Sequence, residues 1–470
     1  MVIGAIADTL GRGIEGVTDA VSETFFEPVI RLGVTGLARS GKTVFITSLV
    51  ANLLDRGRMS GLEAAGAGRI EAAFLQPQPD DTVPRFDFES HLATMTGVTP
   101  SWPESTRTIS ELRLSLRVRP RGLLSGLQGP RTVHLDIVDY PGEWLLDLGL
   151  LDQSFEAWSA EALARATRRA EGGAYLAALD SVDPAGKLSE TQAADLARAW
   201  TAYLQAARAA GYSDCTPGRF LLPGDLDGSP ALTFAPLPPS AAGRGSLARE
   251  CARRFEAYKA QVVKPFFREH FARIDRQVVL VDALGAIHAG PPALEDLRQA
   301  LAHILGPFRP GRNSFLTAIL GKRVDKILFA ATKADHVHHE HHGQLQAIMA
   351  ALVTDARRRA DFSGAETQAM AIAALRATIE ETRRVNGRDL GVVRGTLLDS
   401  GKQAALHPGD LPSDPGILLS PAREGAEAWL DADFDVMRFA PAPLSLRTGE
   451  GPPHIRLDRA AEFLIGDKLR

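Results

Sequence analysis

The stretch GLARSGKT, residues 36–43, fits the phosphate-binding pattern G-x-x-x-x-G-K-[ST]. Residues 29–35, VIRLGVT, precede it and have the composition of a strand. Residues 44–54, VFITSLVANLL, follow it and are apolar enough for a largely buried helix. Strand, loop and helix in this order form the context that the pattern requires. The sequence therefore predicts a nucleotide-binding α/β core around this loop.

The glycine and polar positions of the loop have predicted tasks. Gly36 and Gly41 let the backbone curl so that its N–H groups point at phosphate oxygens, and the helix that starts near Lys42 adds its positive dipole end. We expect Lys42 to reach the β- and γ-phosphates and the Thr43 hydroxyl to hold Mg²⁺. The predicted nucleotide contacts of the loop are Gly36, Ala38, Arg39, Ser40, Gly41, Lys42, Thr43 and Val44.

The composition is that of an ordinary globular protein, with 45% hydrophobic and 23% charged residues among 470. A net charge of −4 gives no general attraction to nucleic acid, so we expect no nucleic-acid partner. Cys215 and Cys251 fit neither a disulfide framework nor a metal-binding spacing. Because no apolar run is long enough to span a membrane and no signal-peptide pattern is seen, we expect a cytoplasmic location.

Residues 1–26 carry apolar side chains at a spacing of three to four, which predicts one amphipathic helix. We expect it to pack on the main domain. The alternative is a helix on a membrane surface, but its polar face is not rich in Lys and Arg, as such helices usually are. Peripheral membrane association therefore has no support in the sequence.

An antiparallel hairpin is predicted next. Residues 112–118 alternate between apolar and polar side chains, which is typical of a half-exposed strand, and residues 132–139 form a second strand after a Gly- and Pro-containing turn. That second strand ends in DYPG, residues 139–142. A carboxylate there can hold Mg²⁺, so Asp139 is a predicted metal ligand. Gly142 offers an unobstructed backbone N–H to a γ-phosphate.

Residues 143–274 look mostly helical and are predicted to form an insertion domain. Ser189 can cap a helix that ends before Gly211, and a further helix over 247–274 is expected to bend at Pro265. Between them, residues 213–246 are rich in Pro, Gly and Ser and indicate a long surface excursion.

Two short apolar strands, 278–282 and 326–331, then predict a buried parallel sheet. The second is followed by TKAD, residues 332–335, which fits [NT]-K-x-D. A carboxylate at Asp335 can accept hydrogen bonds from the N1–H and the N2 amine of guanine, whereas adenine has neither group. The Lys333 stem is expected to lie along the base. The predicted base contacts are Thr332, Lys333, Asp335, His336, Ala374 and Leu375, the last two after a strand at 368–373.

Five histidines lie between residues 336 and 342. His338 and His342 have the spacing of four at which a helix can present two imidazoles to zinc, with Glu340 as a further ligand. The alternative is a polar, partly packed helix start, and the sequence leaves both interpretations open.

With these motifs in one order, the chain resembles the YcjX-like family of bacterial stress-associated P-loop GTPases. The strings that carry the resemblance are GLARSGKT at 36–43, WPESTRT at 102–108, DYPGEW at 139–144, TKADHVHH at 332–339 and HIRLDR at 454–459. The resemblance covers nearly the whole chain. It implies a nucleotide-binding core with a helical insertion, GTP or GDP with Mg²⁺ as ligands, and a link to the envelope-stress response.

The chain departs from the usual small-GTPase pattern at two positions. Ala38 stands where glycine is common, which tightens the space near the γ-phosphate. Glu143 stands where many relatives place the glutamine that orients the attacking water, and a γ-phosphate repels a carboxylate. We therefore expect nucleotide binding with slow hydrolysis.

Arg107 lies on the polar segment before the hairpin, where the first switch of a GTPase is expected. The sequence Thr106-Arg107-Thr108 resembles the arrangement in heterotrimeric G-protein α subunits, in which the Thr completes the Mg²⁺ shell and the Arg stabilises the transferring phosphoryl group. Thr108 is preferred to Thr106 as the Mg²⁺ ligand. The alternative is that Arg107 is solvated or pairs with Glu104. The predicted catalytic residues are Lys42, Arg107 and Glu143, and the predicted metal ligands are Thr43, Thr108 and Asp139.

The predicted fold is α/β, a doubly wound, mainly parallel P-loop NTPase sheet with an antiparallel hairpin at its edge. The predicted parts are an N-terminal helix (1–26), a GTPase core in two pieces (27–142 and 275–378), a helical insertion domain (143–274) and a C-terminal segment of irregular and β structure with a final helix (379–470). The leading hypothesis is a GTP-dependent switch whose insertion contacts a protein partner. The alternatives are an ATP-dependent enzyme, which the TKAD string argues against, and a scaffolding protein with static nucleotide.

Overall fold

The computed structural model describes residues 27–37, 39–104, 108–121, 129–304, 324–354, 357–358, 364–385, 387–424 and 437–470. The predicted N-terminal helix, Ala38 and Arg107 lie outside these residues.

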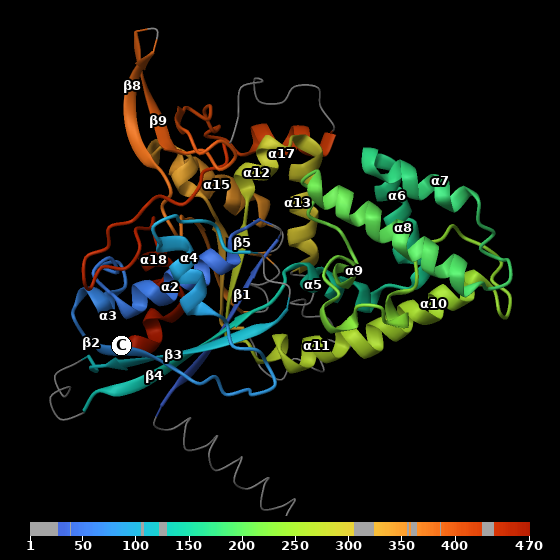
Figure 1. Ribbon diagram of the computed structural model, residues 1–470, viewed down its shortest axis with the longest axis horizontal. Coiled ribbons are helices and arrows are strands. Elements are labelled where there is room, and N and C mark those ends of the chain that lie inside the picture. Colours follow the sequence, from blue (N-terminus) through green and yellow to red (C-terminus); the bar gives the residue numbers. More distant parts are fainter. Residues whose placement is uncertain are drawn as a thin grey trace, which may run out of the picture.

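A mixed seven-stranded sheet forms the centre of the molecule, in the order β2-β3-β4-β1-β5-β6-β7 (Figure 1). Its strands are β1 (Val29–Gly36), β2 (Ile70–Gln76), β3 (Ser110–Val118), β4 (Arg131–Asp139), β5 (Arg276–Val281), β6 (Lys326–Ala331) and β7 (Glu366–Ala371). Strands β4, β1, β5, β6 and β7 are parallel, and β3 is antiparallel to both of its neighbours. The predicted α/β P-loop fold with an antiparallel edge is confirmed.

The hairpin strand β3 differs from its prediction, because it is buried on both faces rather than half-exposed. The turn-rich region before it contains β2, which the sequence analysis missed and which covers the outer edge of β3. Arg113 is only 11% exposed because its guanidinium donates to Asp136 Oδ1 of β4 at 2.6 Å. A buried ion pair between neighbouring strands thus produces the same alternating pattern as a solvated face.

Helices cover both faces of the sheet (Figure 1). On one face lie α2 (Lys42–Leu54), α3 (Glu63–Gly66), α4 (Phe88–Thr96) and α18 (Leu457–Ile465). Their apolar side chains, such as Phe45 and Leu464, join those of the strands in one hydrophobic cluster. The other face carries α12 (Ala283–His288), α13 (Pro291–Ile304) and α15 (His342–Leu352).

The segment after β4 is helical, as predicted, and extends to one side of the sheet (Figure 1). Its helices are α5 (Glu143–Leu146), α6 (Phe155–Arg168), α7 (Gly173–Asp180), α8 (Glu190–Ala209), α9 (Gly218–Leu221), α10 (Leu247–Tyr258) and α11 (Lys264–Glu269). Trp158 stacks on Phe255 with ring centroids 5.0 Å apart, at the centre of an aromatic core. This core is continuous with the apolar side chains beneath the sheet. The domain boundaries stay a prediction.

Two local predictions in this segment can be compared with the structure. The Ser189 side chain caps α8 as expected, by accepting from the backbone N–H of Gln192. The helix after Ser246 is interrupted by a π-helical turn, Lys259–Val263, just before the expected bend at Pro265. Near the expected bend the chain therefore departs from regular α-helical geometry, in a wider turn that begins six residues before the proline.

The C-terminal part forms a separate three-stranded antiparallel sheet of β8 (Ile379–Val385), β9 (Arg388–Thr396) and β10 (Gln403–Leu406), followed by α17 (Gly416–Glu424). Its last segment returns to the main sheet. Ile455 exchanges backbone hydrogen bonds with Ala373, and Asp458 accepts from the N–H of Gly61. No helix among the described residues is both long enough and apolar enough to cross a membrane.

Candidate functional site

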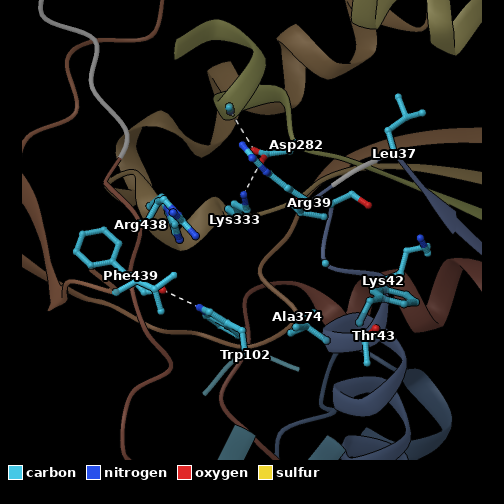
Figure 2. Close-up of a pocket in the computed structure, with 18 of the residues that line it drawn as sticks. Leu37, Arg39, Lys42, Thr43, Trp102, Asp282, Lys333, Ala374, Arg438 and Phe439 are labelled. Atoms are coloured by element: carbon cyan, nitrogen blue, oxygen red, sulfur yellow. Dashed lines mark hydrogen bonds and ion pairs between the residues drawn. The ribbon is translucent and has the colours of Figure 1, made fainter. Parts of the chain in front are cut away.

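A cavity of about 770 Å³ opens at the carboxyl ends of the parallel strands (Figure 2). Its walls include residues 39–45 of the phosphate loop, residues 332–336 after β6, and residues 373–375 after β7. These are three of the segments that the sequence predicted to contact one nucleotide. The fold brings them together because parallel strands end at one edge of the sheet.

The phosphate loop turns sharply at Arg39 and Gly41, whose φ angles are +63° and +81°. Gly41 is needed for this backbone conformation rather than for space. Gly36 is needed for space, since a Cβ atom there would lie 2.1 Å from Ser40 Oγ. Lys42 begins α2 and its Nζ arches back toward the Gly36 carbonyl oxygen, 3.4 Å away. The loop thus has the tight curl that a phosphate cradle requires.

The predicted metal ligands differ in their position. Thr43 is buried and lines the cavity, and Asp139 is 1% exposed at the end of β4, in register with Val34 of β1. A hydroxyl and a carboxylate beside a phosphate loop are oxygen donors of the kind that Mg²⁺ takes, so these two fit the ion. Thr108 is exposed and is not part of the cavity wall, so its role as a ligand stays a prediction.

The DYPG turn runs against the phosphate loop. A Cβ atom on Gly142 would lie 2.2 Å from the Gly36 carbonyl oxygen, so only glycine permits this approach of the two backbones. The turn therefore lies next to the loop, as predicted from the motif order. Glu143, the next residue, is buried and lines the cavity.

At the opposite end, Asp335 is 3% exposed and its Oδ2 accepts from the Ala377 N–H at 2.8 Å. Lys333 has a φ angle of +60°, and its ammonium pairs with Asp282 at the end of β5 (Figure 2). Both Asp335 and Lys333 line the cavity. A buried carboxylate fixed by one backbone N–H has a second oxygen with which it can recognise a base.

His336 also lines the cavity, and its ring contacts Phe439 with centroids 5.2 Å apart. Burial lowers the pKa of His336 below that of a free imidazole, so the ring is neutral at pH 7. His342 hydrogen-bonds through Nε2 to the Ala334 carbonyl oxygen, and it is not among the described residues whose ligand atoms converge with those of His338. The atoms that converge are instead those of His338, His339 and Glu380, within 4.8 Å of one another.

The sequence analysis missed several residues of the wall. Trp102, the first residue of the WPESTRT segment, donates from Nε1 to the Phe439 carbonyl oxygen at 2.7 Å (Figure 2). Two segments that are distant in the sequence thus form one part of the cavity wall. Asp282 could have been found, since it is a carboxylate at the end of a buried parallel strand. Arg208 could not, because an arginine near the end of an amphipathic helix has no distinctive local pattern.

Arg208 lies in the last turn of α8 and lines the cavity from the side of the helical segment. Its Nη2 atom is 2.8 Å from Glu143 Oε1. The two side chains are 28% and 5% exposed, respectively. Glu143, the first residue of the predicted insertion, is therefore in direct contact with the end of α8.

The chain is similar to proteins of known classification along almost its full length. The sequence model of the YcjX-like family, DUF463, matches residues 30–469 of the chain. A protein named Ras-like GTPase YcjX from Escherichia coli (strain K12) is 38% identical, over 94% of this chain and 96% of the relative. A protein of the same name from Shewanella oneidensis (strain MR-1) is 36% identical, over 94% of each chain. With the phosphate loop, the DYPG turn and the TKAD segment gathered around one cavity, the chain belongs to the YcjX-like family.

Proposed function

We propose that the protein is a Mg²⁺-dependent, guanine-nucleotide-binding P-loop GTPase that hydrolyses GTP slowly and acts as a switch. The observation that supports this most is the single cavity with the phosphate loop at one end and the buried Asp335 at the other. Relatives with more than a third of their residues identical carry the name Ras-like GTPase. A guanine nucleotide can occupy both ends of this cavity at once, with its phosphates at the loop and its base at Asp335.

Base selectivity is assigned to Asp335. One of its carboxylate oxygens is held by the Ala377 N–H, which fixes the carboxylate plane. The other can accept from the N1–H and N2 amine of guanine, whereas adenine would leave a buried carboxylate without these donors. Sites built around a hydrogen bond reject analogues that lack it, so an ATP-dependent enzyme is the weaker alternative.

Phosphate binding and hydrolysis are assigned to the opposite end of the cavity. Lys42 and the loop N–H groups bind phosphate oxygens, and Thr43 and Asp139 hold Mg²⁺, which offsets the negative charge that develops on the phosphates. Arg107 and Thr108 keep their predicted roles as transition-state arginine and further Mg²⁺ ligand. We expect slow hydrolysis because the sequence has alanine at position 38, where glycine is common, and a carboxylate at position 143, where many relatives have glutamine.

The switch is assigned to the segments around the γ-phosphate, 101–110 and 139–150, and to the helical segment that reports their state to a protein partner. The resemblance to stress-associated GTPases suggests a role in the bacterial envelope-stress response, in the cytoplasm. A scaffold stabilised by static nucleotide is the alternative, and it requires the same protein surface with GDP and with GTP.

Calorimetric titration with GDP, GTP, ADP and ATP, with Mg²⁺ and with EDTA, tests the binding proposal. We expect tight binding of both guanine nucleotides, weaker GTP binding in EDTA, and adenine nucleotides bound at least about a hundredfold less tightly, or about 2.7 kcal/mol. Equal affinity for ADP and GDP would contradict the proposal. Limited proteolysis with GDP and with a non-hydrolysable GTP analogue separates the switch from the scaffold, which predicts identical cleavage patterns.

A further inference from the structure

A carboxylate beside the γ-phosphate presents a chemical problem. Glu143 follows directly after Gly142, whose backbone is pressed against Gly36 of the phosphate loop. At this position a hydrogen-bond acceptor can orient the water that attacks the γ-phosphorus. A carboxylate is a good acceptor, but its charge is repelled by the phosphates unless a cation offsets it.

The structure places such a cation on Glu143. Arg208 Nη2 lies 2.8 Å from Glu143 Oε1, and the carboxylate is 5% exposed, so this pair is shielded from solvent. The other oxygen, Oε2, is buried and has no hydrogen-bond partner among the described residues. Unsatisfied buried carboxylate oxygens are costly and rare, so this atom has unused capacity to accept a hydrogen bond.

Arg208 comes from a rigid element that belongs to the helical segment. Helix α8 is 20 residues long, and Trp200 and Tyr203 of its buried face pack in the aromatic core. The guanidinium reaches the cavity from the C-terminal end of α8, where Arg208 and Ala209 line the wall. Glu143 is the first residue of α5, directly after the DYPG turn that follows β4.

We propose that Arg208 is a positioning residue for GTP hydrolysis. It holds Glu143 Oε1 and offsets the carboxylate charge, so that Oε2 can accept a hydrogen bond from the attacking water. The water oxygen then bonds to the γ-phosphorus while the bond from that phosphorus to the β–γ bridging oxygen breaks. The products are GDP and inorganic phosphate, to which the water proton passes. This proposal rests on the proposed GTPase function of the site.

A regulatory consequence follows from where Arg208 is anchored. When α8 is seated, Glu143 is neutralised and hydrolysis proceeds. If α8 moved away from α5, Glu143 would regain its full charge beside the γ-phosphate and hydrolysis would slow. A partner protein that shifts α8 would therefore control the lifetime of the GTP-bound state without contacting the nucleotide.

A role in stability alone explains the contact less well. Buried ion pairs add little net stability, since the desolvation of both charges offsets their attraction. Arg208 is also 28% exposed toward the cavity side, whereas the arginine partners of purely internal pairs, such as Arg169, are 5% exposed.

Single-turnover GTP hydrolysis of the full chain tests this proposal as a double-mutant cycle. We expect Arg208→Ala to lower the rate about tenfold or more in the wild-type background, with GDP affinity unchanged. In a Glu143→Gln background there is no charge to offset, so the same change should alter the rate by less than about threefold. Arg198→Ala is the matched control, since Arg198 lies on α8 but is exposed and pairs with Asp195.

Other results would overturn the proposal. If Arg208→Ala lowered the rate equally in the wild-type and Glu143→Gln backgrounds, Arg208 would act independently of Glu143. Such equal losses are the result expected for Arg107→Ala. If Arg208→Ala lost GDP affinity, GTP affinity and melting temperature in parallel, Arg208 would be a structural residue. In that case Arg208→Lys, which keeps the charge, would restore all three properties together. If wild-type protein binds no GTP in calorimetry, the proposed function fails first, and that outcome is distinct from a wild-type rate in Arg208→Ala.

Discussion

The two ends of the cavity are built in different ways. The phosphate end is centred on one continuous stretch, residues 36–43, whose shape is set by its own glycines and by the helix that follows. The base end is assembled from Trp102, from Asp282 and the TKAD segment, and from Phe439. Its geometry depends on tertiary contacts such as the hydrogen bond from Trp102 to the Phe439 carbonyl.

This difference separates two kinds of energetic contribution. A local phosphate cradle carries formal charge and acts on every nucleotide, whatever its base. A base site assembled from several segments contributes hydrogen bonds and contacts. Each of these supplies a smaller part of the binding free energy, and together they distinguish one base from another. Substitutions at the two ends should therefore differ in the size of their effect on affinity and in whether the base matters.

The largest effect on affinity is expected from Lys42→Ala at the phosphate end. Lys42 is the loop residue predicted to place a charge at the β-phosphate, so we expect at least about a hundredfold loss, roughly 2.7 kcal/mol, for GDP and GTP alike. Calorimetry with both nucleotides measures it, with the exposed Arg117→Ala on β3 as control. Binding of GTP within about threefold of wild type would refute the assignment of the loop.

A smaller and base-dependent effect is expected from Asp335→Asn. The variant can still accept from Ala377, but it presents an amide to the base, so guanine loses a partner. We expect a loss of about 1–3 kcal/mol for guanine nucleotides and a shift in preference toward xanthine nucleotides. Competition between GDP, XDP and ADP measures the shift. An unchanged preference for guanine over adenine would show that another group reads the base.

A still smaller effect is expected from Trp102→Phe. This change keeps the apolar contact and removes the hydrogen bond to the Phe439 carbonyl, which is worth about 0.5–1.5 kcal/mol, or about two- to twelvefold in affinity. Although Trp102 lies in the predicted switch segment, it is held by Phe439, whose ring contacts His336 at the base end, so the loss should be equal for GDP and GTP. A loss confined to GTP would instead connect Trp102 with the γ-phosphate.

The same contrast explains what the sequence could predict. The loop, the DYPG turn and the TKAD segment are local patterns whose residues lie next to one another in the chain. Their gathering at one edge follows from the parallel strands, so this part of the cavity was predictable. The strand periodicity of residues 112–118 was misleading because Arg113 has a buried partner on β4.

What the sequence could not predict depends on pairings between distant residues. Arg208 and Glu143 are 65 positions apart, and nothing in either local sequence indicates their contact. Trp102 and Phe439 meet only because the C-terminal segment returns across the cavity. The pairing of Ile455 with Ala373 shows how that return is fixed, through backbone hydrogen bonds that carry no side-chain signature.

Asp147 offers a comparison outside the cavity, directly after α5. Its carboxylate is fully buried and accepts from the Gly218 N–H at 2.7 Å and from the Tyr258 hydroxyl at 2.5 Å. Burial raises the pKa of Asp147 to about 7, above the ordinary value of 3.8, although these hydrogen bonds and nearby Arg219 counteract the shift. This residue joins elements of the fold without being part of the cavity wall.

Asp147→Asn should therefore leave nucleotide affinity unchanged and alter only the pH dependence of stability. Between pH 4 and pH 7 the folded state keeps a proton on Asp147 that the unfolded chain releases, because the raised pKa of about 7 belongs to the folded state. The free energy of unfolding of the wild type accordingly falls as pH rises through this range. An amide cannot titrate, so the variant should lose a slope worth up to about 1.4 kcal/mol per pH unit. Urea denaturation at pH 5, 6, 7 and 8 measures the difference. If the stability profiles of the two proteins were parallel, Asp147 would be ionised in the folded state throughout. Profiles that differ in slope between pH 5 and pH 7 would show that the folded state binds a proton at Asp147, beside Gly218 and Tyr258.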